Sequence, residues 1–199
     1  TWHWHNPPHT GSWRGTRHRR SHTLSAWSSH VEGTQLRIGQ GFDLHPLGEG
    51  RPFPLGGVII PTNDGRGPLG HSDGDPLLHA LIDAILGSVA MGDIGGWFPD
   101  TDDAWKDTPS ANLLRLVLGD PRLQGWKLIN LDCTIFTSTP RLSPYIHAIR
   151  ESLANLLGTD AARISVKSKS GNGLGDAGQG RAVAAQAIVL ADVSTLNHP

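Results

Sequence analysis

The sequence predicts an α+β fold in which one mixed sheet carries its helices on one face. Extended and helical patterns alternate from Leu36 onward, in the order strand, hairpin, helix, helix, strand, helix, strand, strand. The 25 glycines and 14 prolines indicate many tight turns, and 199 residues are enough for one domain with its own core. We expect a domain over residues 36–193, a tail at 194–199 and a disordered extension at 1–35.

The strands are expected where apolar residues alternate or run together. LRIGQGFDLH, at 36–45, places Leu36, Ile38 and Phe42 on one face. RPFPLGGVIIP, at 51–61, is typical of a hairpin with a Gly-Gly turn. Three further strands are expected at 127–138, 163–170 and 181–193, of which the last is almost wholly apolar.

Three helices are expected between these strands. The stretch HSDGDPLLHALIDAILG predicts a helix over 76–90, with Asp75 as its N-cap and Pro76 in its first turn. SANLLRLVLGD, at 110–120, follows with Ser110 as a cap. SPYIHAIRESLANLLG, at 143–158, has Pro144 near its start and Gly158 past its end. The segment 92–107 is rich in Gly, Pro and Asp, and the segment 171–180 is rich in Gly, so both are expected to be loops.

The composition excludes several classes of protein. The net charge of −1 gives no electrostatic argument for binding nucleic acid. Cys133 is the only cysteine, so neither an intrachain disulfide nor a zinc site with several cysteines can form. No apolar run approaches the length of a membrane span. A bound metal would therefore take His, Asp or Glu as ligands.

Residues 1–31 differ from the rest of the chain. They hold four arginines and no acid, and therefore carry +4, which leaves −5 for the remainder. They lack the continuous apolar segment of a secretory signal. We interpret them as a disordered extension that suits an organelle transit peptide, with a linker from a larger fusion or a wrongly assigned start as alternatives. The domain is accordingly expected in the bacterial cytoplasm, or in a plastid or apicoplast stroma if the extension is a transit peptide.

Three residues have the chemistry and spacing of a metal site. Asp43 and His45 are two apart in a strand, so both side chains leave the same face. Alone they would also suit a solvated strand end. His79, on the 76–90 helix, adds a third ligand, and three protein ligands leave the open position of a catalytic zinc. Asp83 lies one helical turn after His79 and is expected to orient the second nitrogen of its ring.

Three other clusters carry weaker signals. His71 and Ser72, with Asp73 and Asp75, would form either a polar turn with a helix cap or a proton donor near a developing charge. GDIGGWFPDTD, at 92–102, is either an acidic surface loop or a ligand-binding loop. KSKSGNGLGDAGQG, at 167–180, is either a hairpin connection or a phosphate cradle, and it matches neither the P-loop nor the dinucleotide pattern.

Taken together and in order, these segments resemble the 2-C-methyl-D-erythritol 2,4-cyclodiphosphate synthase family. The resemblance covers about Leu36 to Val193 and is carried by GFDLHPL, HSDGDPLLHALIDAILGSVAMGDIG, FPDTD, TPRLSPYI and the glycine-rich loop. It implies a homotrimer of α+β subunits, each with a four-stranded sheet, and active sites between neighbouring subunits. It also implies a lyase of the non-mevalonate isoprenoid pathway.

The resemblance further implies the reaction and its cofactors. The substrate is 4-diphosphocytidyl-2-C-methyl-D-erythritol 2-phosphate, whose 2-phosphate attacks the β-phosphorus and releases CMP. Zn²⁺ or a similar divalent cation sits at the three-ligand site, and Mg²⁺ or Mn²⁺ binds the substrate diphosphate. The nucleophile belongs to the substrate, so positioning and charge neutralisation are most of what the protein supplies.

The family's site residues carry over to matching positions of this sequence. The metal ligands are Asp43, His45 and His79, with Asp83 behind the histidine, and the catalytic residues are His71 and Ser170. The expected substrate-binding residues are Asp43, Leu44, His45, His71, Ser72, Asp93, Ile94, Gly95, Phe98, Pro99, Asp100, Thr101, Asp102, Thr137, Ser138, Thr139, Pro140, Arg141, Leu142, Ser143, Lys169, Ser170, Gly171, Asn172, Asp176 and Gln179.

Four positions depart from the family pattern. Asn172 stands where many members have a glutamate that helps to hold the second cation, and Lys169 with Ser170 stands where two threonines are common. Gln179 replaces an arginine near the trimer axis. The altered loop leaves a catalytically lapsed homologue that binds cytidine nucleotides as an alternative function. An unrelated zinc hydrolase is a further alternative. It would need a general base, for which Asp83 is the nearest candidate, but Asp83 is expected to orient His79.

Overall fold

The computed structural model describes residues 34–196, and the extension predicted at 1–35 therefore lies almost wholly outside the described part. The α+β fold predicted from the sequence is confirmed in residues 34–196. Gln35 already pairs with the end of the domain, because its carbonyl accepts from the Val193 N–H at 2.8 Å. None of the helices in residues 34–196 is both long enough and apolar enough to cross a bilayer.

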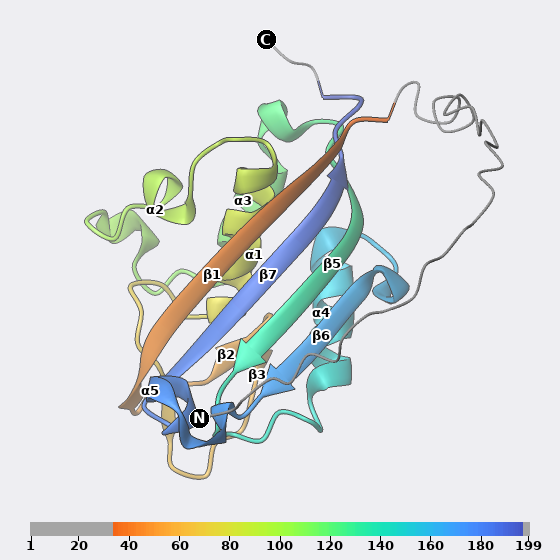
Figure 1. The fold of residues 1–199 in the computed structure, drawn as a ribbon. Helices are drawn as coiled ribbons and strands as arrows, with labels where there is room; N and C mark the ends of the chain where they lie inside the picture. The colour runs from red at the N-terminus through yellow and green to blue at the C-terminus, as the bar shows by residue number, and fades with distance from the viewer. Residues whose placement is uncertain (1–33, 197–199) are drawn as a thin grey trace, which may run out of the picture. The chain divides into compact units, whose positions relative to one another are not determined.

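The main sheet has five strands in the order β4-β1-β7-β5-β6, of which Figure 1 shows β1, β7, β5 and β6 side by side. Their bounds are β1 Leu36–Glu49, β4 Arg66–Pro68, β5 Lys127–Phe136, β6 Ile164–Lys169 and β7 Ala182–Asp192. β5 and β6 are parallel, with helix α4 (Ile146–Leu157) between them in the chain, while the other pairs are antiparallel. The sheet is therefore mixed, as expected.

The expected number of four strands is wrong. β1 extends beyond the segment whose apolar residues predicted it, and this extension pairs with a fifth strand. Its first eleven residues pair with β7, and Leu47–Glu49 continue beyond that partner to pair with β4. Arg66 holds this added edge, since its guanidinium donates to the Leu47 and Gly180 carbonyls at 3.0 Å each. A three-residue strand has too little sequence pattern to be recognised.

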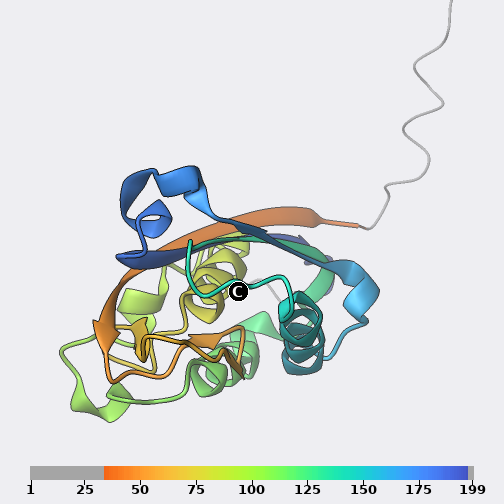
Figure 2. The ribbon, with the colours of Figure 1, turned by 90° about the horizontal axis from the view of Figure 1, so that it is seen from below.

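The larger helices cover one face of the sheet (Figure 2). They are α1 (Pro76–Ser88), α3 (Ser110–Leu118) and α4. The buried apolar side of α1 supplies much of the core, with Leu77, Leu81 and Ile85 fully buried. α1 packs on β1 at Gly39 and Gly41, where an added Cβ would lie 1.7 Å and 2.0 Å from helix carbonyl oxygens, so only glycine allows this approach.

The apolar residues of β1 lie on the opposite face. Since alternate side chains of a strand leave opposite faces, Ile38 and Phe42 point away from α1. They are 71% and 53% exposed, and Leu36, Leu44 and Ile188 of β7 are exposed beside them. The strand thus turns glycines and polar residues toward the helices, and apolar residues outward.

Shorter elements complete the fold. The predicted hairpin is confirmed as a separate two-stranded sheet, β2 (Pro54–Leu55) with β3 (Val58–Ile59), and both turn glycines have positive φ. The two expected loops contain short helices, α2 (Ile94–Trp97) and α5 (Gly175–Gly178). Both are rich in glycine and too short to show a helical pattern of apolar residues. α3 begins at Ser110 with Pro109 as N-cap, so the expected capping role of Ser110 is wrong.

Candidate metal centre and substrate pockets

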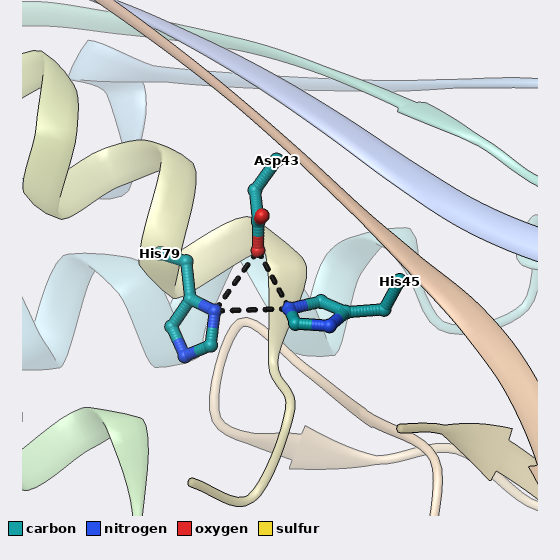
Figure 3. Close-up of side chains that lie close together, drawn as sticks. All are labelled: Asp43, His45 and His79. Carbon is teal, nitrogen blue, oxygen red and sulfur yellow. Dashed lines mark hydrogen bonds and ion pairs between the residues drawn. The ribbon is translucent and has the colours of Figure 1, made fainter. Parts of the chain in front are cut away.

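Asp43, His45 and His79 converge on one point between β1 and α1 (Figure 3). Asp43 Oδ2 lies 2.8 Å from His45 Nε2 and 2.9 Å from His79 Nδ1, and the two nitrogens lie 3.1 Å apart. Ligand atoms of a tetrahedral zinc ion lie about 3.3 Å apart, given metal–ligand bonds of about 2.0–2.1 Å. The three side chains predicted from their spacing therefore have the arrangement of one face of such a site.

The donor set also has the chemistry of a cation site. His45 Nδ1 donates to the Leu69 carbonyl at 2.7 Å, because that oxygen can only accept. A neutral His45 then turns the lone pair of Nε2 toward Asp43 and His79. A carboxylate and two ring nitrogens that meet in a half-buried place need a proton or a cation between them. These residues fit a divalent metal with nitrogen and oxygen ligands.

The electrostatics of the centre favour its charged form. Burial opposes ionisation of Asp43, but hydrogen bonds from His45 and His79 outweigh it, so the pKa of Asp43 lies well below its usual range. Burial alone would lower the pKa of His45, yet the hydrogen bond to Asp43 and the negative charge there raise it above its ordinary value. Asp43 is thus held as an anion, which is the form that binds a cation.

The partners behind His79 differ from the prediction. Its second nitrogen, Nε2, lies 2.8 Å from Ser110 Oγ and 3.0 Å from Ser72 Oγ. Asp83, expected at this place, instead accepts from the Ile94 N–H at 2.7 Å and so fixes the start of α2. The physical reason is that helix side chains tilt toward the helix N-terminus, so the ring reaches away from the turn that carries Asp83.

The turn that leads into α1 is rigidly held. Asp75 is fully buried and is the N-cap, accepting from the Leu77 and Leu78 N–H groups at 3.0 Å each. Its carboxylate also accepts from Gly56 and Gly57 in the hairpin turn, at 2.9 and 2.7 Å. Its predicted role as a cap is confirmed. Because His79 lies one turn further on, this cap fixes the position of a candidate ligand.

A cavity of about 380 Å³ opens beside the three converging side chains. We call it the metal pocket. Nine of the residues expected at the site line it, namely His45, His71, Ser72, His79, Ile94, Gly95, Phe98, Pro99 and Asp100. Trp105 and Leu113 line it as well. No sequence motif pointed to these two, because Trp105 ends a short turn in a loop and Leu113 lies within the apolar pattern of α3.

A second cavity, of about 440 Å³, holds other predicted residues and shares no lining residue with the metal pocket. We call it the loop pocket. It lies at the ends of β5 and β6 and is lined by Thr137, Ser138, Pro140, Arg141, Leu142, Ser143, Ser168, Lys169 and Ser170. Lys169 and Ser170 are exposed there. The structure therefore brings the predicted residues together as two groups.

The remaining predicted residues line neither cavity. Asp93 and Asp102 cap short helical turns, accepting from Gly96 and Ala104 N–H groups at 2.8 and 2.9 Å. Asp176 pairs with Arg181, with Arg181 Nε donating at 2.8 Å, and Gln179 accepts from the same guanidinium. The other members of this group are Leu44, on the outer face of β1, Thr101, Thr139, and Gly171 with Asn172, which adjoin Ser170.

Comparisons with known proteins show the family of the chain. The model of the YgbB family matches residues 36–192. The 2-C-methyl-D-erythritol 2,4-cyclodiphosphate synthase of Geobacillus kaustophilus is 50% identical over 155 residues, which are 78% of this chain and 97% of that enzyme. A solved structure of 2C-methyl-D-erythritol-2,4-cyclodiphosphate synthase aligns with a TM-score of 0.71 and 42% identity over 78% of this chain and 100% of the other. A CDP-bound form aligns with the same TM-score, 40% identity and the same coverage. The chain belongs to the YgbB family.

Proposed function

We propose that the chain is a 2-C-methyl-D-erythritol 2,4-cyclodiphosphate synthase. The reaction converts 4-diphosphocytidyl-2-C-methyl-D-erythritol 2-phosphate to the 2,4-cyclodiphosphate and releases CMP, as a step of non-mevalonate isoprenoid biosynthesis. The observation that carries this proposal is the 50% identity to a synthase over 97% of that enzyme's length. The intact arrangement of Asp43, His45 and His79 supports an active enzyme over a lapsed homologue.

Asp43, His45 and His79 are proposed to hold Zn²⁺ or a similar divalent cation. When bound, the cation would polarise a phosphate of the substrate and offset its charge. The anionic Asp43 and the lone pairs of the two rings support this assignment. Because the three ligands come from β1 and α1, which pack without intervening side chains at Gly39 and Gly41, the centre is held by rigid elements.

The remaining residues position the substrate. The attacking oxygen belongs to the 2-phosphate, so no protein nucleophile is required, and Cys133 is unsuited to be one because burial raises the pKa of its thiol to about 12. His71 is half-buried at the mouth of the metal pocket, with Nε2 3.1 Å from the Asp102 carbonyl. We assign His71 and Ser170 to stabilise charge that develops as the phosphorus–oxygen bonds change.

The loop pocket is proposed to bind the cytidine part of the substrate. A synthase of similar structure has been solved with CDP, which supports a cytidine nucleotide as ligand. The exposed Lys169 ammonium would offset the charge of the diphosphate next to this pocket. Mg²⁺ or Mn²⁺ on that diphosphate would have an amide oxygen at Asn172 rather than a carboxylate, since hard cations accept both kinds of oxygen.

A homotrimer with active sites between subunits is proposed for two reasons. The predicted site residues form two separate cavities, and a neighbouring subunit would bring a metal pocket to a loop pocket. The outer face of β1 and β7 exposes Ile38, Phe42 and Ile188 side by side, and contiguous apolar surface of this kind is typical of an interface. A cyclic trimer would bury it.

The compartment is proposed from relatives and from the extension. The relative from Geobacillus kaustophilus is bacterial, which supports the bacterial cytoplasm. A plastid or apicoplast stroma is the alternative if residues 1–31 are a transit peptide, and those residues lie outside the described part of the chain.

The direct test of the proposed activity is the release of CMP. Purified protein is incubated with the substrate, Zn²⁺ and Mg²⁺, and CMP is separated and quantified together with the cyclic diphosphate. We expect one CMP for each cyclic product. Failure to form CMP above a heat-inactivated control would contradict the proposal. A large gain of turnover in Asn172→Glu would instead support the lapsed homologue.

A further inference from the structure

A buried chain of hydrogen bonds runs from Asp73 to His79 through Ser110. Asp73 Oδ1 accepts from the Ser110 hydroxyl at 2.5 Å, and Asp73 Oδ2 accepts from the Ser110 N–H at 3.1 Å. Ser110 Oγ lies 2.8 Å from His79 Nε2. Ser110 is fully buried and His79 is 8% exposed, so water has little access to compete with these bonds.

The direction of the hydrogen bonds follows from the carboxylate. An ionised carboxylate can only accept, so the Ser110 O–H proton points to Asp73. Ser110 Oγ can then only accept from His79, which places a proton on Nε2 of the ring. In the neutral imidazole this leaves the lone pair on Nδ1, the atom that faces Asp43 and His45.

We infer that Asp73 and Ser110 are positioning residues that select the metal-binding tautomer of His79. This inference rests on the proposed metal centre and adds a role for two residues outside it. Ser72 supports the same state, because its hydroxyl lies 3.0 Å from Nε2 and can accept a shared hydrogen bond. His45 has the corresponding arrangement with a backbone carbonyl, so each histidine has its outer nitrogen fixed by an acceptor.

The same two residues also fix the geometry of the pocket. Asp73 belongs to the turn before α1, and Ser110 is the first residue of α3. The two hydrogen bonds between them join these elements, while the Asp73 N–H donates to the Thr108 carbonyl at 3.2 Å. We call the hydrogen-bonded chain Asp73–Ser110–His79 the relay. Its removal affects both the tautomer of His79 and the distance between two walls of the metal pocket, and the test must separate these effects.

The test measures zinc affinity in the full chain, with a chromophoric chelator as competitor, for wild type, Ser110→Ala, Ser110→Thr and Asp73→Asn. We expect Ser110→Ala and Asp73→Asn to weaken zinc binding by about 10–100-fold, the usual cost of losing a partner behind a metal ligand. In Asp73→Asn, the side-chain NH₂ must face either the Ser110 hydroxyl or the Ser110 backbone N–H. One of the two hydrogen bonds is therefore disturbed while the side chain keeps its size. Ser110→Thr keeps the hydroxyl and should retain most of the affinity.

A matched control is Ser88→Ala, which removes another buried hydroxyl at the far end of α1. Ser88 donates to the Ile85 carbonyl at 2.7 Å, far along the helix from His79, so zinc affinity should be unchanged even if stability falls. Nitrogen-15 spectra of the zinc-bound protein add a second readout, in which His79 Nε2 should carry a proton in wild type.

Three results would overturn the inference. In the first, Ser110→Ala and Asp73→Asn both bind zinc as tightly as wild type, while His79→Ala does not. The second is a zinc-bound wild type in which His79 Nε2 carries no proton. In the third, the wild-type chain itself binds no zinc, and the proposed metal centre then fails together with the relay.

Discussion

The metal pocket and the loop pocket are built in different ways. The metal pocket takes its three candidate ligands from β1 and α1, and the partners of these ligands are buried side chains or backbone carbonyls. The loop pocket lies at strand ends, where Lys169 and Ser170 are exposed and the side-chain hydrogen bonds are local, as between Arg141 and Ser143. The difference is consistent with the proposed trimer, in which each subunit would hold a metal centre of its own and share the substrate-binding surface with a neighbour.

The largest effect is expected for His79→Ala, which removes one of three ligands. Since loss of a supporting partner costs about 10–100-fold, loss of the ligand itself should lower CMP formation by more than about 100-fold and remove most bound zinc. Zinc content by atomic emission and turnover are the measurements. His147→Ala is the control, because that histidine is exposed on α4. Stoichiometric zinc in His79→Ala would show that the ligand set is wrong.

The next effect is expected at the outer face of β1. Phe42→Asp places a charge on the surface proposed to be buried between subunits, so the trimer should dissociate and activity should fall by about tenfold or more at low protein concentration. Light scattering after size-exclusion chromatography gives the oligomeric state. Leu116→Asp changes an apolar residue of similar exposure on α3 and should leave the oligomeric state unchanged. A trimeric and active Phe42→Asp would refute the proposed interface.

A smaller effect is expected in the loop pocket, at Lys169. Lys169→Met removes a charged hydrogen-bond donor, so KM for the substrate should rise by about tenfold, while zinc affinity stays at the wild-type value. Steady-state kinetics at several salt concentrations are the measurement. Lys127→Met, at the start of the neighbouring strand β5, is the matched control. Weaker zinc binding in Lys169→Met would mean that the two pockets are not independent within a subunit.

The smallest effect concerns pH. The pKa of His45 is raised above its ordinary value, so protons compete for this ligand already at pH values above 6.5. Zinc affinity should therefore decrease as the pH falls through this pKa, by at most about tenfold for each pH unit per displaced proton. Competition titrations between pH 8 and pH 6 measure the decrease. A constant affinity over that range would contradict the assignment of His45 as a ligand.

The sequence predicted what depends on local pattern. The cap at Asp75, the turn at Gly56 and Gly57, and the shared face of Asp43 and His45 all follow from residues close together in the chain. The strand β4 did not follow, because three residues carry no periodicity. The short helices in glycine-rich segments were missed for the same reason.

The partners of His79 show the second limit of sequence reasoning. Asp83 was expected there because i and i+4 lie on one side of a helix, but the ring points toward the helix N-terminus. Ser110 takes the place, although it is 31 residues away in the chain. No local sequence pattern shows that the first residue of α3 lies next to the first turns of α1, so this contact depends on tertiary packing.

One measurement tests the central claim, that a metal pocket and a loop pocket from neighbouring subunits form each active site. His79→Ala and Ser170→Ala, each nearly inactive alone, are co-expressed with different tags, and mixed trimers are purified through both tags. If sites lie between subunits, every mixed trimer has one site of its three with both intact pockets, so about one third of wild-type CMP formation should be restored. Mixed trimers as inactive as their parents would show that each subunit forms its own site and would contradict the account.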